Sequence, residues 1–127
     1  MKMKKTIQTK NAPAPIGPFS QAAVYGGTLY VSGQLALDPA TGELAPADIK
    51  IQTRRVMDNL MAIVEAAGST AGNILKCTIL LTDMGDFAAM NEVYGSYFEG
   101  EPPARICYQV SALPRGAMVE VDAVAAI

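Results

Sequence analysis

Arg105 is the residue in this chain whose type and position best suit the binding of an anion. It falls within residues 104–110, where side chains of alternating character predict a β-strand. An unpaired guanidinium is rare in the interior of a strand. Arg105 therefore either forms a structural ion pair with an acid on an adjacent strand, or binds the carboxylate of a small ligand through two parallel hydrogen bonds.

Two acids share one face of another predicted strand, residues 118–127. Glu120 and Asp122 would lie about 7 Å apart in a regular strand. One of them is a candidate general base, or both are solvated acids on an exposed sheet face. Nothing besides this alternation singles out Asp122.

Three smaller side chains complete the list of polar candidates. Cys107 has no histidine or lysine near it in sequence to lower its pKa, which argues against a nucleophile. Cys77 and Cys107 cannot build a four-sulfur zinc site, so they are either two thiols in a reducing cytoplasm or one bridge. Ser32 either donates a hydrogen bond to a ligand or caps a turn.

Composition excludes several classes of function. The chain has no histidine, which removes Ser-His-Asp and Cys-His catalysis and all histidine metal sites. Four of its 10 basic residues lie in the first ten positions, so the remainder is acidic and ill suited to nucleic acid. Residues 1–127 contain no secretory signal and no membrane-length apolar run, which predicts one soluble, cytoplasmic domain.

The elements that must position these residues follow from periodicity and turn signals. Apolar runs at 22–25 and 29–32 flank Gly26-Gly27-Thr28, which is typical of a tight hairpin. A helix begins after Asp48 and ends at Gly68, and a second helix spans residues 86–98. Further strands are predicted at 75–82, 104–110 and 118–127.

With one further strand expected before the first helix, the order is β-β-β-α-β-α-β-β, which predicts an α+β fold with two helices on one face of a mixed sheet. The loop 111–117 is short enough to join two antiparallel neighbours. Ile106 and Tyr108 point away from Arg105 and are interpreted as core residues. The face without helices, where Arg105 and Cys107 are expected to present a mixed surface, needs cover, which predicts an oligomer, most simply a trimer.

A series of short motifs also occurs in order along residues 11–127. They include Ile-Gly-Pro-Phe-Ser-Gln-Ala at 16–22, Ser-Gly-Gln at 32–34, Leu-Thr-Asp-Met at 81–84, Met-Asn-Glu-Val-Tyr at 90–94, Pro-Ala-Arg at 103–105 and Val-Glu-Val at 119–121. Each motif is weak alone, but the ordered set closely resembles the RidA family, also called YjgF, the reactive intermediate/imine deaminases.

The resemblance implies a chorismate-mutase-like fold, a homotrimer with sites between subunits, and no metal or cofactor. It implies hydrolysis of 2-imino acids and their enamine tautomers, such as 2-iminopropionate and 2-aminoacrylate, to 2-keto acids and ammonia. By the same resemblance Arg105 binds the substrate carboxylate and Glu120 holds or activates the water. Four other residues would line the pocket, with backbone groups at Gly33 and Cys107: Ser32, Gly33, Asn91 and Cys107.

One position departs from the pattern. Many members carry a tyrosine where this chain has Phe19, so a hydroxyl that contacts substrate or water is missing. Three functions remain open at this point: an imine deaminase, a regulatory protein that binds keto acids at the same pocket without turnover, and the ribonuclease or translation-inhibitor activity attached to some relatives. The acidic body argues against the last.

Overall fold

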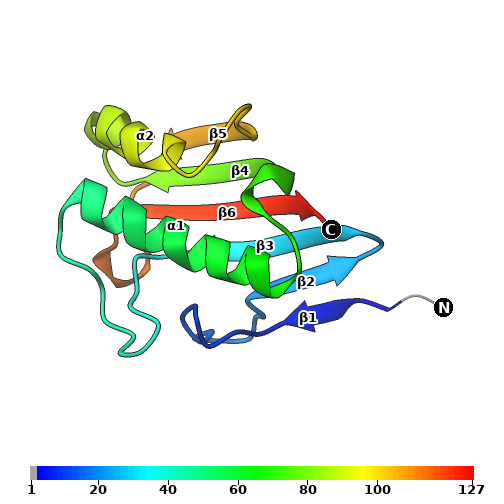
Figure 1. The fold of residues 1–127 in the computed structure, drawn as a ribbon. Helices are drawn as coiled ribbons and strands as arrows, with labels where there is room; N and C mark the ends of the chain where they lie inside the picture. The colour runs from blue at the N-terminus through cyan, green and yellow to red at the C-terminus, as the bar shows by residue number, and fades with distance from the viewer. Residues whose placement is uncertain (1–2) are drawn as a thin grey trace.

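The computed structural model describes residues 3–127, which form one six-stranded sheet with two α-helices on one face (Figure 1). The strands are β1 Lys5–Ile7, β2 Ala22–Tyr25, β3 Thr28–Gln34, β4 Ile74–Leu81, β5 Ala104–Gln109 and β6 Val119–Ala126. The helices are α1 Ile49–Ala66 and α2 Phe87–Gly95, and three 3-10 turns, η1 Ala71–Asn73, η2 Met84–Asp86 and η3 Pro114–Gly116, lie in the connections.

The predicted α+β class and element order are confirmed. The first strand is β1, which pairs with β2 from a polar N-terminal segment that carried no strand signal. The hairpin turns at Gly26 and Gly27, both with positive φ, and Thr28 already belongs to β3. None of the helices in residues 3–127 is long and apolar enough to cross a membrane.

Helix α1 forms where the periodicity placed it. The Asp48 side chain accepts a hydrogen bond from the Ile51 backbone N–H at 3.0 Å, as an N-cap should. Gly68, with φ of 82°, ends the helix in the left-handed region. Val56, Leu60 and Ile63 are fully buried against the sheet, so this face of α1 anchors the core.

The prediction that the last two strands are neighbours is wrong. The sheet order is β1-β2-β3-β6-β4-β5, so β6 lies between β3 and β4 and is antiparallel to both. A parallel pair needs a crossover, and α2 provides it between β4 and β5. The chain then returns past β4 to β6, whose alternating Val119, Val121 and Ala123 are buried on one face between β3 and β4.

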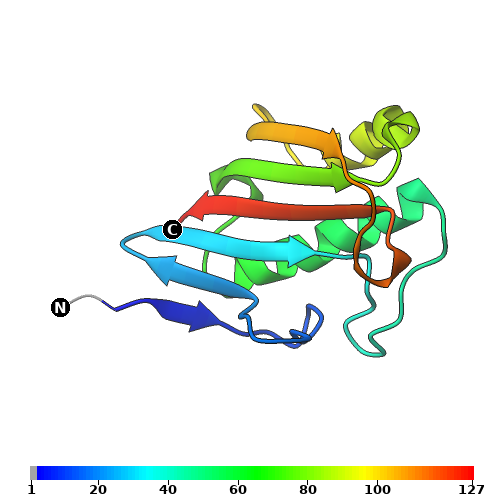
Figure 2. The ribbon, with the colours of Figure 1, turned by 180° about the vertical axis from the view of Figure 1, so that it is seen from behind.

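The orientation of β5 also differs from the prediction. Its register places Arg105 level with Cys77 and Cys107 level with Ile79, and both partners are buried beneath the helices. Ile106 and Tyr108 therefore point to the opposite side, which we call the open face (Figure 2). They are 48% and 51% exposed, so their interpretation as core residues is wrong for the single chain.

Candidate active site

The side chain of Arg105 is hydrogen-bonded to a residue of α2, and no acidic side chain in the part of the chain that the structure describes pairs with it. Its Nη1 donates a hydrogen bond of 2.6 Å to Asn91 Oδ1. Within residues 3–127 the one ion pair within 4.0 Å joins Lys50 and Glu92, so the structural ion pair considered for Arg105 is not formed. A half-buried cation of this kind is available to an anion from outside the chain.

Two aromatic rings and two thiols surround the same guanidinium. Its Cζ lies 5.4 Å from the centroid of Phe87 and 5.1 Å from that of Tyr94, within cation–π range. Both cysteines are free thiols, and burial raises the pKa of Cys77 and of Cys107 above the usual value. Cys107 is therefore a neutral group in the wall of this site and not a thiolate nucleophile.

A second group of predicted residues lines a cavity of about 480 Å³ at the end of the sheet. The predicted residues in its walls are Phe19, Ser32, Gly33 and Glu120, and Ile16, Pro114 and Arg115 also line it. Phe19 is 50% exposed, so its ring is at the cavity rim and not in the core. The walls are largely apolar, with one carboxylate among them, which is the usual composition of a small-molecule site.

Glu120 is the acid in this cavity whose properties suit a proton acceptor. Burial, and secondly the charge of Asp122, raise the pKa of its carboxyl above the usual value. Asp122 instead accepts a hydrogen bond of 2.9 Å from the Thr78 backbone N–H, so it is tied to β4. The two acids are half-buried, and the prediction of a freely solvated pair does not describe them.

Ser32 is tied to the chain rather than free to donate. Its Oγ donates to the Ser20 carbonyl at 2.6 Å, and its backbone N–H donates to the Gln21 carbonyl at 2.9 Å. The hydroxyl oxygen can still accept a hydrogen bond from a ligand. Ser32 thus holds the segment that carries Phe19 against β3.

Sequence reasoning missed three buried amides near this site: Gln21 and Asn59 bond residues of the cavity wall, and Gln52 ties α1 to the start of β6. Gln21 Nε2 donates to the Thr9, Ala12 and Pro13 carbonyls, Gln52 Nε2 to the Ala45 carbonyl, and Asn59 Nδ2 to the Leu35 and Leu37 carbonyls. Gln52 Oε1 also accepts from the Met118 backbone N–H, just before β6. Gln52 alone carried a signal, since it lies one turn before Val56 on the apolar row of the predicted helix and an amide buried there must find partners.

The two groups of residues do not meet within one copy of the chain. Arg105, Asn91 and Cys107 lie on the helix side of the sheet edge. Glu120 pairs with Leu80, which alternates with the buried Ile79 and Leu81 of β4. Its side chain therefore lies on the open face. No cluster of three or more metal-binding side chains occurs in residues 3–127.

Comparison with known proteins shows what this chain is similar to in sequence and in fold. The family model described as Endoribonuclease L-PSP matches residues 9–127. The 2-iminobutanoate/2-iminopropanoate deaminase of Mus musculus is 48% identical over 123 residues, covering 97% of this chain and 91% of that protein. The crystal structure of RidA from an Antarctic Psychrobacter is 45% identical, with a TM-score of 0.94 over 97% of this chain and 99% of that one.

A further crystal structure, that of Escherichia coli TdcF with bound serine, is 42% identical and has a TM-score of 0.93, covering 97% of this chain and 98% of that one. The likeness spans nearly the full length in each case, in sequence as well as in fold. The chain therefore belongs to the RidA/YjgF family, whose family model carries the Endoribonuclease L-PSP description.

Proposed function

We propose that the protein hydrolyses 2-imino acids and their enamine tautomers to 2-keto acids and ammonia. The observation that carries this proposal is Arg105, a half-buried guanidinium that has an amide and two rings around it and no acid of its own. Such a fork matches a carboxylate through two parallel hydrogen bonds. The deaminase name of the mouse relative supports the same substrate class.

The chemistry needs few groups. Water adds to the electrophilic imine carbon while the Glu120 carboxylate accepts a proton from it. Glu120 passes that proton to the nitrogen, and the hydroxyl proton of the resulting tetrahedral intermediate follows by the same route as the carbonyl forms. The carbon–nitrogen bond then breaks and ammonia leaves. The protein orients substrate and water and moves protons, which one guanidinium and one carboxylate can do.

We further propose that three copies assemble with their open faces turned inward, so that the β5 edge of one copy, with Arg105, meets the Glu120 cavity of the next and sites are shared between subunits. Two observations support this. Arg105 and Glu120 lie on opposite faces of the sheet within one chain, so a second copy is needed to combine them. The open face also exposes large apolar side chains, including Tyr30, Ile106 and Tyr108. The two free thiols support a reducing, cytoplasmic location.

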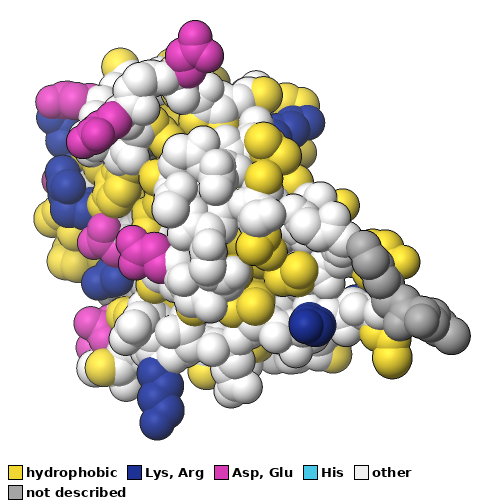
Figure 3. All heavy atoms as spheres, turned by 45° about the vertical axis from the view of Figure 1, so that its right-hand side comes forward, with side chains coloured by type: hydrophobic (Ala, Val, Ile, Leu, Met, Phe, Trp, Pro, Cys, Tyr) yellow, Lys and Arg dark blue, Asp and Glu magenta, His cyan; other side chains and the backbone are white. Residues whose placement is uncertain are grey.

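A second candidate function is binding without turnover, in which the same pocket holds a keto acid or another small carboxylate for regulation. The TdcF structure favours it, since serine carries a carboxylate of the same kind. Nucleic acid is not a proposed partner. On the face shown in Figure 3 the basic side chains are scattered and form no continuous surface.

A turnover assay separates these functions. An imino acid is generated in place from alanine by an amino-acid oxidase, and keto acid and ammonia are measured with and without the protein. Faster release of ammonia with wild-type protein, and not with Arg105→Lys, supports the deaminase. If the protein binds pyruvate but does not accelerate imine hydrolysis, the regulatory alternative is supported. RNA cleavage by protein free of contaminating nuclease would support the ribonuclease activity.

Subunit mixing tests the shared site. Arg105→Lys and Glu120→Gln proteins are each expected to be inactive. After co-expression in equal amounts, about a quarter of the sites receive a native Arg105 from one copy and a native Glu120 from the next. Recovery of that fraction of activity supports sites between subunits, whereas no recovery in confirmed mixed assemblies contradicts them.

A further inference from the structure

The side of α2 that faces β5 carries three residues that contact Arg105. Phe87, Asn91 and Tyr94 are spaced i, i+4 and i+7, so they form one stripe along the helix. Asn91 accepts a hydrogen bond from Nη1 of the guanidinium, and the two rings lie over its Cζ. No other acceptor in residues 3–127 bonds the guanidinium, so its remaining N–H groups are free for a ligand.

We propose that Phe87 and Tyr94 are positioning residues, whose rings orient the guanidinium of Arg105 for a ligand carboxylate. This inference rests on the proposed function. An arginine side chain is long and flexible, and a bidentate contact requires its plane to be fixed. The rings pack against that plane while leaving the N–H groups at its edge able to donate.

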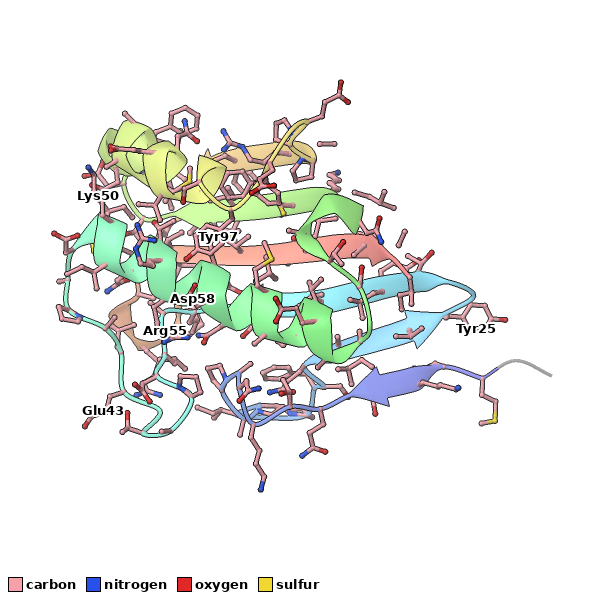
Figure 4. The ribbon with its side chains drawn as sticks, in the orientation of Figure 1. Tyr25, Glu43, Lys50, Arg55, Asp58 and Tyr97 are labelled. Atoms are coloured by element: carbon pink, nitrogen blue, oxygen red, sulfur yellow. The ribbon has the colours of Figure 1, made fainter. Side chains whose placement is uncertain are left out.

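Two exposed contacts join α2 and the segment after it to α1, and neither is made by a residue of the stripe. Lys50 Nζ lies 2.8 Å from Glu92 Oε2, and the Tyr97 hydroxyl, just beyond α2, donates to Asp58 Oδ1 at 2.7 Å (Figure 4). Burial, and secondly Asp58, raise the pKa of Tyr97 to about 12, so this donor persists at neutral pH. The rings themselves are held by packing, since Tyr94 is a buried member of the hydrophobic core and Phe87 packs against that core.

The ring of Tyr94, and not its hydroxyl, is the part that acts on Arg105. The hydroxyl is buried without a well-formed hydrogen bond within residues 3–127, beside the Cys77 thiol. Removing it leaves the cation–π contact in place and uncovers no partner. Tyr94→Phe is thus a ring-retaining variant, and Phe87→Tyr is its counterpart at the other ring.

The experiment measures pyruvate affinity by calorimetry and, where turnover occurs, kcat and KM for the imine made from alanine. Phe87→Leu and Tyr94→Leu are expected to weaken pyruvate binding about fivefold or more and to raise KM more than they lower kcat. The ring-retaining variants Phe87→Tyr and Tyr94→Phe should stay within about twofold of wild type. Tyr97→Leu is the control, since it removes a ring that contacts α1 and not Arg105.

The outcomes separate this inference from the proposed function. If the wild-type protein binds pyruvate but does not turn over the imine, the deaminase proposal fails. The pyruvate affinities of the variants then still test the role of the two rings. Folded ring-removing variants that bind pyruvate as tightly as wild type would overturn the positioning role, and so would an equal loss in Tyr97→Leu. Phe87→Met, which keeps apolar volume without a ring, serves if Phe87→Leu does not fold. Wild-type protein that neither binds pyruvate nor accelerates imine hydrolysis overturns both proposals.

Discussion

The carboxylate of Glu120 lies directly over the Cα of Gly33. A Cβ at position 33 would overlap a carboxylate oxygen and come within 2.9 Å of Cδ and 3.2 Å of Cγ of Glu120. Gly33 does not have a positive φ, so its backbone conformation does not itself require glycine. The missing side chain is what lets Glu120 reach its place in the cavity.

Gly33→Ala is therefore expected to lower kcat for imine hydrolysis by about tenfold to a hundredfold, because the displaced carboxylate no longer meets the water. The melting temperature should change little, since Glu120 can swing toward the cavity. Gly95→Ala is the control, as a Cβ there meets nothing within 4 Å. An unchanged kcat in Gly33→Ala would show that the position of Glu120 is unimportant.

Arg105→Lys keeps the charge and removes the fork. Losing one charge-assisted hydrogen bond costs about 1.5–3 kcal/mol, which corresponds to a fall in kcat/KM of about tenfold to a hundredfold. The fold should persist, because no ion pair of Arg105 is broken. Steady-state kinetics and thermal melts check this, and wild-type turnover in the variant would refute carboxylate binding by Arg105.

Phe19→Tyr should raise activity or change the preferred imine while leaving stability nearly unchanged. The ring is 50% exposed at the cavity rim, so a hydroxyl has room and contact with water. Kinetics on several imines, with melts alongside, measure the effect. A loss of several kcal/mol in stability would mean that the added oxygen has no room.

Asp122→Asn should move the acidic limb of the kcat/KM profile to lower pH. The carboxylate form of Glu120 is the proton acceptor, and it is lost as pH falls through its raised pKa. Removing the charge of Asp122 lowers that pKa, although burial, the larger cause, keeps it above the usual value. Glu65→Gln, which neutralises an exposed acid on α1, should leave the profile unmoved. An identical profile in both variants would contradict the assignment of the limb to Glu120.

Ile106→Glu should dissociate the assembly. The wild-type mass by light scattering is expected near three times 13.4 kDa, and that of the variant near one. A charge at this position on the open face would be buried without a partner in the trimer. Ile51→Glu is the matched control, since Ile51 is also 48% exposed but lies on α1. A wild-type monomer at micromolar concentration would refute both the trimer and the shared site.

Local features of the sequence predicted most of the elements. The cap at Asp48, the stop at Gly68 and the apolar row of α1 are short-range signals, and the structure has that helix at Ile49–Ala66. The Gly26-Gly27 turn likewise specified its hairpin. Alternation along β6 correctly separated the buried Val119 and Val121 from Glu120.

Long-range pairing decided what these signals could not. Alternation shows which residues of a strand share a face, but not which face the helices cover. Only the parallel pairing of β5 with β4 turned Arg105 toward Phe87 and Tyr94, and left Ile106 exposed. Only the insertion of β6 beside β3 brought Glu120 over Gly33. Contacts between residues far apart in the chain depend on how all the strands and helices pack together, which no local pattern encodes.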